Sequence, residues 1–209
     1  MTIKKLLLLS FLALFVNSLA QAQDVDSTVS KLDQRKHKLM FGAGLNIPME
    51  PNSRTHDLGM SVSQQYEYLL WSHFSLMQSL SFNFITGQKI NENYHGQEIV
   101  TQYNNFYVVP LQVGIVWYFG ENHKKFFIAF AGGAAWYQGV EPAYPEIVVN
   151  GITVRPAIPE KEFSGVFNFF TPSIGWQWDR LQLRTTYQGT INTDTQLNVW
   201  NISLAYRVF

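Results

Sequence analysis

The sequence predicts an all-β protein, an eight-stranded antiparallel up-and-down transmembrane β-barrel. From about residue 39 to the end, apolar side chains recur at every second position, as in strands, and no long stretch shows the 3.6-residue period of a helix. The connections between the expected strands alternate strictly between long and short. This alternation puts all short turns at one rim, as in outer-membrane barrels whose short turns face the periplasm.

The composition limits the classes of function. The 209 residues carry no net charge and only 14% of them are charged, which argues against a nucleic-acid partner because phosphate binding needs clustered positive charge. The chain contains no cysteine. A lipid-anchored cysteine, disulfides and thiolate metal sites are therefore excluded.

The first residues have the pattern of an export signal. Lys4 and Lys5 precede an apolar run over 6–16, and Ala-Gln-Ala at 20–22 has the small-x-small form of a cleavage site. The apolar run is too short to span a bilayer as a helix. We therefore expect 1–22 to be a cleaved signal peptide.

The mature chain divides into a leader and a barrel. Residues 23–38 are polar without an apolar period, which predicts a flexible periplasmic leader, and the barrel is expected to cover 39–209. Its strands are expected at 39–47, 58–70, 74–85, 103–119, 125–137, 163–178, 181–190 and 197–209. The loops expected to face the outside are 48–57, 86–102, 138–162 and 191–196.

The two faces of the expected strands differ in character. In 103–119 one face is almost entirely large and apolar, whereas the other includes Gln112 and Gly114. The apolar face consists of Tyr107, Val109, Leu111, Val113, Ile115, Trp117 and Phe119. The segment 163–178 alternates in the same way. These patterns predict an apolar face toward outer-membrane lipid and a polar lumen.

A secreted or periplasmic lipocalin-like barrel that binds a small apolar ligand would show the same alternation with its faces reversed. The tryptophans favour the membrane barrel, because they fall near strand ends, where two interfacial girdles would lie. These residues are Trp71, Trp117, Trp136, Trp176, Trp178 and Trp200.

Two prolines conflict with a regular barrel. Pro110 and Pro172 lie inside expected strands, where each removes a hydrogen-bond donor from the ladder. We expect β-bulges at both positions.

Several motifs of the expected strands carry a family resemblance. They are Glu67-Tyr68-Leu69-Leu70, Phe74-Ser75-Leu76, Tyr107-Val108-Val109-Pro110-Leu111, Trp117-Tyr118-Phe119-Gly120, Ala131-Gly132-Gly133 and the ending Leu204-Ala205-Tyr206-Arg207-Val208-Phe209. Together they resemble the PorT-like outer-membrane β-barrel family of Gram-negative bacteria. The resemblance covers about 67–209. It implies an outer-membrane location, recognition of the last strand by the barrel-insertion machinery, and a role in an envelope or secretion complex.

Three charged residues are expected inside the barrel. Strand parity points Glu67, Arg184 and Arg207 inward near the periplasmic rim. A charge in such a narrow lumen must be paired. We expect a lumen ion cluster, with a structural or a gating role.

The sequence indicates no catalytic or metal site. The five histidines fall in the leader, turns or loops without metal-ligand spacing. Ser72 and His73 are adjacent on a short turn, where we expect poor geometry for proton transfer. A non-enzymatic protein without metal or cofactor is therefore expected.

The longest loop, 138–162, is the best candidate for contact with a protein partner. Its centre resembles a small hairpin that turns at Asn-Gly, a sequence that favours tight hairpins. The residues expected to meet the partner are Ile147, Val149, Asn150, Gly151, Ile152 and Val154. The sequence thus predicts a non-enzymatic outer-membrane barrel, either a component of an envelope or secretion complex or a loop-mediated binding protein.

Overall fold

The fold is taken from a computed structural model, which describes residues 36–94, 97–120, 124–149, 152–191 and 197–208. The chain divides into two compact units, Met1–His37 and Lys38–Phe209. Almost all of the first unit lies outside the described residues. The predicted signal peptide 1–22 and most of the leader 23–38 lie there too.

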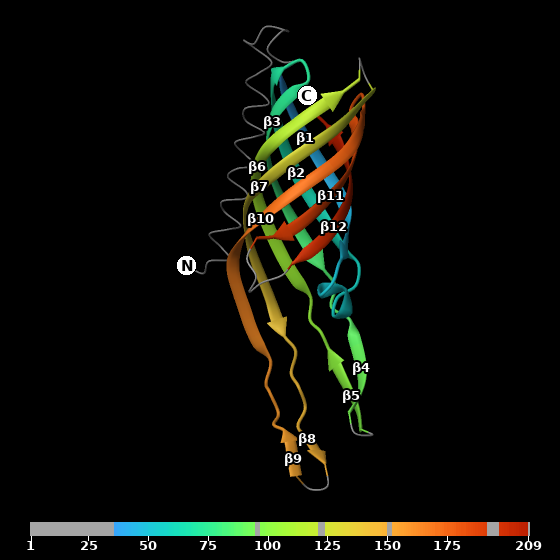
Figure 1. The fold of residues 1–209 in the computed structure, drawn as a ribbon, viewed down its shortest axis with the longest axis vertical. Helices are drawn as coiled ribbons and strands as arrows, with labels where there is room; N and C mark the ends of the chain where they lie inside the picture. The colour runs from blue at the N-terminus through green and yellow to red at the C-terminus, as the bar shows by residue number, and fades with distance from the viewer. Residues whose placement is uncertain (1–35, 95–96, 121–123, 150–151, 192–196, 209) are drawn as a thin grey trace. The chain divides into compact units, whose positions relative to one another are not determined.

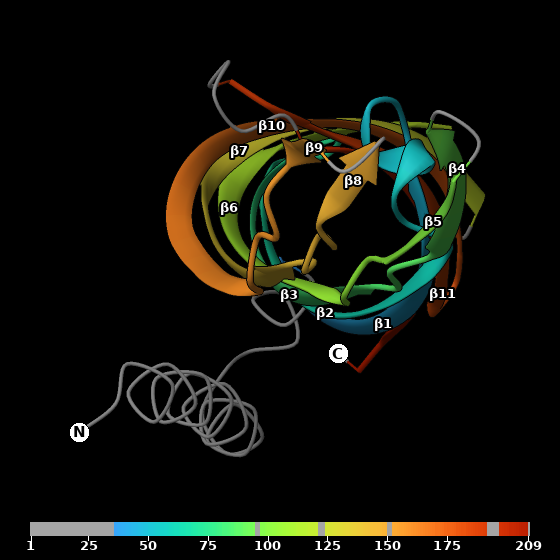
Figure 2. The same ribbon diagram turned by 90° about the horizontal axis from the view of Figure 1, so that it is seen from below.

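Eight strands form a closed barrel, which confirms the predicted fold. They are β1 (His37–Pro48), β2 (Gly59–Trp71), β3 (Phe74–Ile85), β6 (Phe106–Phe119), β7 (Lys124–Glu141), β10 (Lys161–Trp178), β11 (Leu181–Thr190) and β12 (Asn198–Arg207). Each strand is hydrogen-bonded to its neighbours in the chain order of an up-and-down barrel, and β1 closes the ring against β12. Figure 2 shows the strands around a common axis.

The short connections lie at one end of this barrel. Trp71 and Phe74 flank a two-residue turn, and Asp179 and Arg180 join β10 to β11. Asp179 has a φ of 45°, a left-handed conformation that Asp tolerates better than most residues. Within the described residues, no helix is long and apolar enough to cross a membrane.

Two hairpins extend from the other end of the barrel (Figure 1). One consists of β8 (Ile147–Val149) and β9 (Ile152–Arg155), where the sequence predicts a hairpin; its turn at 150–151 lies outside the described residues. The other consists of β4 (Lys89–Tyr94) and β5 (Gln97–Gln102), in a segment expected to be a loop. A short 3₁₀ helix, η1 (Asn52–Arg54), lies in the β1–β2 connection.

The two prolines do not produce bulges, so that expectation is wrong. The pairing of β3 with β6 lapses opposite Pro110 and resumes in the same register, and the pairing of β10 with β11 does the same at Pro172. On the other side, β7 pairs with both prolines without interruption. Each proline removes a single donor, so a short gap in one ladder suffices and no extra residue is inserted.

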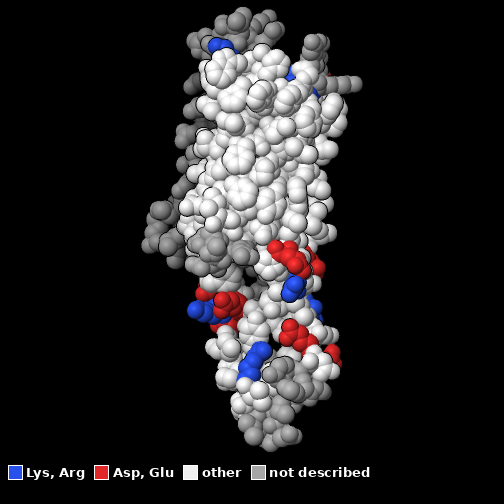
Figure 3. All heavy atoms as spheres, in the orientation of Figure 1, with Lys and Arg blue, Asp and Glu red and all other residues white. Residues whose placement is uncertain are grey.

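The outer wall of the barrel is apolar, as the strand faces predict. Val113 is 62% exposed, and Ile115, Trp117 and Ile174 are exposed with it. Among the side chains that the structure describes, exposed charges on barrel strands occur only in the ends of β7 and β10 near the hairpins. Figure 3 shows a barrel wall without charge between its two ends. Leu39 is an exception, because parity assigns it to the outer face and it is only 2% exposed.

Apolar side chains fill the lumen near the long loops, and polar side chains lie in its middle. Gln112 and Thr171 meet there, with a 2.6 Å hydrogen bond from the hydroxyl of Thr171 to the amide oxygen of Gln112. Near the long loops the lumen is filled by Ile85, Phe106, Val108, Ala135, Phe167, Phe169, Leu197 and Val199. A second apolar cluster, which includes Met77 and Phe127, lies toward the short turns. The lumen is therefore filled by side chains, as expected for eight strands.

Candidate functional site

A buried carboxylate lies in the lumen toward the short-turn end. Glu67 points inward from β2 and its side chain is 0% exposed. The hydroxyl of Tyr118 on β6 donates a 2.6 Å hydrogen bond to Glu67 Oε2. The side-chain amide of Gln65 donates to Oε1 over 2.5 Å. Both carboxylate oxygens therefore accept a hydrogen bond, as burial of a charge requires.

Two cations on different strands face this carboxylate. Lys38 Nζ on β1 lies 3.5 Å from Glu67 Oε2, and Arg184 Nη2 on β11 lies 3.9 Å from Oε1. Lys38 also donates to Gln177 and lies 4.0 Å from the centre of the Tyr118 ring. We call Glu67, Lys38, Arg184 and Tyr118 the lumen cluster.

A glycine makes space for the aromatic neighbour of Arg184. The guanidinium carbon of Arg184 lies 5.1 Å from the centre of the Phe127 ring. That ring occupies the position over Gly175, where a Cβ would come within 2.4 Å of the ring Cζ. The small residue on β10 thus permits the aromatic ring to cover the buried guanidinium.

The structure brings together only part of the predicted ion cluster. Glu67 and Arg184 meet, whereas Arg207 is half-buried and is not within ion-pair distance of Glu67. Lys38 and Tyr118 were not predicted as members of this cluster, because Lys38 falls within the expected leader 23–38 and Tyr118 carries no charge. Parity alone would have placed the Tyr118 hydroxyl inside, at the height of the short turns.

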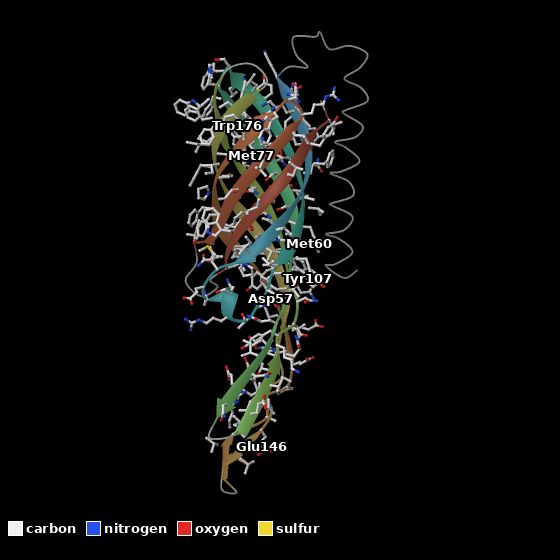
Figure 4. The ribbon with its side chains drawn as sticks, turned by 90° about the vertical axis from the view of Figure 1, so that its right-hand side faces the viewer. Asp57, Met60, Met77, Tyr107, Glu146 and Trp176 are labelled. Carbon is white, nitrogen blue, oxygen red and sulfur yellow. The ribbon has the colours of Figure 1, made fainter. Side chains whose placement is uncertain are left out.

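The tryptophans lie toward the two ends of the barrel. Trp71, Trp117, Trp176 and Trp178 are exposed next to short turns, and Figure 4 shows Trp176 near that end. Trp200 is exposed and pairs with Ile47 toward the other end of β1. Trp136, on β7 opposite Val109, is only partly exposed.

The predicted partner loop is placed in part. Ile147 is 1% exposed, so its expected contact with a partner is wrong. Val154 is exposed, as is Val148, its neighbour in the hairpin. The side chains of Val149, Asn150, Gly151 and Ile152 lie outside the described residues.

The long-loop end of the barrel holds a cavity of about 390 Å³. Its walls come from the β1–β2 loop, the segment between β5 and β6, the end of β7 with the loop that follows, and the start of β10. Five aromatic rings line it: His56, Tyr103, Phe106, Tyr144 and Phe163. We call it the loop cavity.

Burial shifts the pKa values of two groups in the loop cavity. It lowers the pKa of His56, so the imidazole favours its neutral form. Burial, followed by a hydrogen bond with Tyr144, raises the pKa of Tyr103 to about 12. Both rings are therefore uncharged at neutral pH.

The described residues give no metal site, and the Ser72–His73 pair lies on the surface. Among the residues that the structure describes, no three His, Cys, Asp or Glu side chains converge as metal ligands would. Ser72 Oγ lies 2.7 Å from His73 Nδ1, closer than the sequence led us to expect. Both are exposed on a short turn, which lacks the sheltered surroundings that nucleophilic catalysis uses.

Comparisons with known proteins give distant structural likenesses. No family model and no curated protein matches the chain. A crystal structure of Ail, the attachment invasion locus protein of Yersinia pestis, in complex with the heparin analogue sucrose octasulfate, is 12% identical; 82% of this chain and 97% of that chain are covered, with a TM-score of 0.45. The N-terminal β-barrel domain of Pseudomonas aeruginosa OprF is 7% identical, with 82% and 97% covered and a TM-score of 0.42.

A de novo designed transmembrane β-barrel is 11% identical, with 82% of this chain and 95% of that chain covered and a TM-score of 0.37. Likenesses at this level do not assign a function, and the barrel assignment rests on the strand pairing. The resemblance to the PorT-like family is not confirmed by these comparisons.

Proposed function

We propose that the chain is a non-enzymatic outer-membrane β-barrel protein that presents its long loops as a binding surface outside the cell. The observation that carries this proposal is the distribution of apolar and charged side chains. A belt of exposed apolar residues surrounds a closed barrel, and the exposed charges lie beyond it. Such a surface is costly in water and is stable against lipid acyl chains.

The closed ring of strands supports the same proposal. A bilayer offers no hydrogen-bond partners to the backbone, so a spanning sheet must close on itself. The pairing of β1 with β12 removes the free edge. Outer-membrane lipid is therefore the first partner that we propose, and β12 is the strand that the barrel-insertion machinery would recognise.

The lipocalin-like alternative requires the opposite arrangement. A soluble barrel for an apolar ligand has an apolar lumen and a polar exterior. Here the lumen contains Gln112 and Thr171 in its middle and the lumen cluster toward the short turns, while the outside is apolar. We therefore prefer the hypothesis of a membrane-spanning barrel.

Loop-mediated binding is preferred over transport. Eight strands enclose a narrow interior, and this one is filled by the lumen cluster and the two apolar clusters. We propose a structural role for the lumen cluster. In contrast, hairpins β4–β5 and β8–β9 extend from one end of the barrel and expose Val100, Val148 and Val154. No feature among the described residues favours the role in an envelope or secretion complex that the family resemblance implies.

Fractionation of the native cell envelope tests the location. We expect the protein in the outer-membrane fraction, and we expect the detergent extract to migrate differently before and after boiling, as folded barrels do. Protease added to intact cells should cut within 143–159 and should spare a tag placed in 121–123. A folded, monodisperse protein in buffer without detergent would contradict the proposal.

A further inference from the structure

We propose that the loop cavity is a binding site for a neutral saccharide, an inference that rests on the proposed display of the long loops outside the cell. Figure 4 shows this region near the labelled Asp57 and Tyr107, with Glu146, the residue before β8, farther from the barrel. The volume of about 390 Å³ lies in the range of small-ligand sites.

Backbone hydrogen bonds fix the walls of the loop cavity. The N–H of Gln88 donates to the carbonyl of Thr55, and the N–H of Tyr103 donates to the carbonyl of Gln88. The N–H of Asp57 donates to the carbonyl of Thr86. Three segments that are distant in sequence are thus tied together before any ligand arrives, which lowers the entropic cost of binding.

The far wall is held in a similar way. Tyr144 and Ile158 exchange two backbone hydrogen bonds of 2.9 Å each. The guanidinium of Arg155 lies 4.4 Å from the centre of the Tyr144 ring and supports it by a cation–π contact. The Tyr144 ring is therefore held in place as one wall of the cavity.

The aromatic lining suits the C–H-rich faces of a pyranose ring. His56 lies 6.3 Å from Tyr103 and 6.2 Å from Phe106, measured between ring centres. Tyr144 joins these rings in the lining. Neutral rings of this kind pack against a sugar through its apolar face, while the sugar hydroxyls remain free for hydrogen bonds.

Polar groups for those hydroxyls are present in the same walls. Asn104, Asn105, Thr55 and Glu141 line the cavity. Asn105 Oδ1 already accepts a hydrogen bond from the N–H of Gly87, which fixes the orientation of the amide and leaves its NH₂ group as a donor. The Thr55 hydroxyl already donates to the carbonyl of Asn52. The NH₂ group of Asn105 and the carboxylate of Glu141 would pair with a polyhydroxylated ligand, whereas an apolar ligand would cover them without offering hydrogen bonds.

The charge of the surroundings selects a neutral ligand over an anionic one. The described acidic residues of the long-loop end are Glu50, Asp57, Glu92, Glu98, Glu141, Glu146, Glu160 and Glu162, and the basic ones are Arg54, Lys89, Arg155 and Lys161. Acidic residues exceed basic ones by four, and Glu141 lies in the wall itself. This field would repel a sulfated or phosphorylated sugar.

Saturation-transfer NMR on the folded mature protein tests the inference. The protein is held in lauryldimethylamine oxide micelles, because maltoside and glucoside detergents carry sugar headgroups that would compete. The probes are lactose, maltose, diacetylchitobiose and a sulfated heparin disaccharide. A second experiment with lipopolysaccharide tests whether the ligand is a sugar of the cell's own outer membrane or one from another source. We expect saturable transfer with at least one neutral disaccharide, and weaker transfer with the sulfated one.

Variants locate the binding. Tyr144→Ala should weaken binding about tenfold by removing one stacking ring, whereas Tyr144→Phe, which keeps the ring, should retain it. Tyr206→Ala is the matched control, because Tyr206 is an exposed tyrosine at the other end of the barrel.

Three results would each overturn the saccharide site. The first is that no neutral disaccharide gives saturable transfer with protein that is folded, as judged by heat-modifiability. The second is that Tyr206→Ala weakens binding as much as Tyr144→Ala, and the third is that the sulfated disaccharide binds more tightly than the neutral ones. In each case an outer-membrane location found by fractionation would leave the proposed function standing. A protein that is folded in buffer alone would overturn the proposed function, whatever the sugars do.

Discussion

Replacement of Glu67 by glutamine should destabilise the barrel strongly. The substitution keeps the size of the side chain but removes the negative charge that faces Lys38 and Arg184, whose side chains are only 11% and 10% exposed. Breaking a buried ion pair by removing one partner costs about 3–5 kcal/mol, because the remaining charge stays buried. The Tyr118 hydroxyl can still donate to the amide oxygen, so we expect about 3 kcal/mol.

A double-mutant cycle separates the electrostatic part of this loss. Arg184→Met removes one of the two cations that Glu67→Gln leaves without a counter-charge. The loss of unfolding free energy in the double variant should therefore be about 1–3 kcal/mol smaller than the sum of the losses in the two single variants. The assay is reversible urea unfolding in lipid vesicles, followed by tryptophan fluorescence and heat-modifiability.

An exposed ion pair in the same chain provides the control. Arg54 and Glu50 lie 3.2 Å apart with side chains 73% and 72% exposed. Removing such a pair should change the unfolding free energy by less than about 1 kcal/mol. If the Glu67 and Arg184 effects simply add, or if Glu67→Gln is no worse than Arg54→Ala, the lumen cluster does not stabilise the barrel.

Three further predictions concern the wall, the loop cavity and a hairpin. Val113→Arg should cost about 2–4 kcal/mol of unfolding free energy in vesicles, since Val113 lies in the middle of the apolar belt; an unchanged urea midpoint would place this face in water. Burial lowers the pKa of His56 in the folded loop, so at acidic pH the unfolded loop binds more protons than the folded loop does. The loop cavity should therefore lose stability as the pH falls below about 6.5. Limited proteolysis between pH 7.5 and pH 5 measures this loss, and a pH dependence that survives in His56→Gln would contradict its assignment to this residue. Replacement of 146–155 by a short Gly-Ser linker should leave heat-modifiability intact, because the β8–β9 hairpin forms its own two-stranded sheet apart from the barrel; loss of the folded band would refute this independence.

The barrel strands could be predicted because their outer faces have to be continuously apolar. Residues 74–85, 163–178 and 181–190 alternate so regularly that predicted and observed strands agree closely at both ends. In the hairpin β4–β5 the strands Lys89–Tyr94 and Gln97–Gln102 contain few apolar residues, because they do not face a bilayer. That hairpin therefore gave no period-two signal.

The candidate sites were harder to predict for a related reason. A lumen contact joins residues on strands that are distant in sequence, so parity gives the direction of Glu67 and Arg184 but not their partners. Lys38 lies one residue before the expected first strand, and its role follows only from the extension of β1 to His37. The loop cavity lies between strand ends and irregular segments that backbone hydrogen bonds hold together, and the side-chain pattern of the irregular segments carries no signal for this arrangement.

A single-cysteine scan of β6 tests the central claim most directly. The chain contains no cysteine, so each of positions 108–117 can carry one spin label in otherwise unchanged protein reconstituted into vesicles. We predict that labels at odd positions are accessible to oxygen dissolved in the lipid, and that labels at even positions are shielded from it. Odd positions accessible to a water-soluble nickel chelate instead, or a scan without alternation, would contradict a membrane-spanning barrel with its apolar face outward.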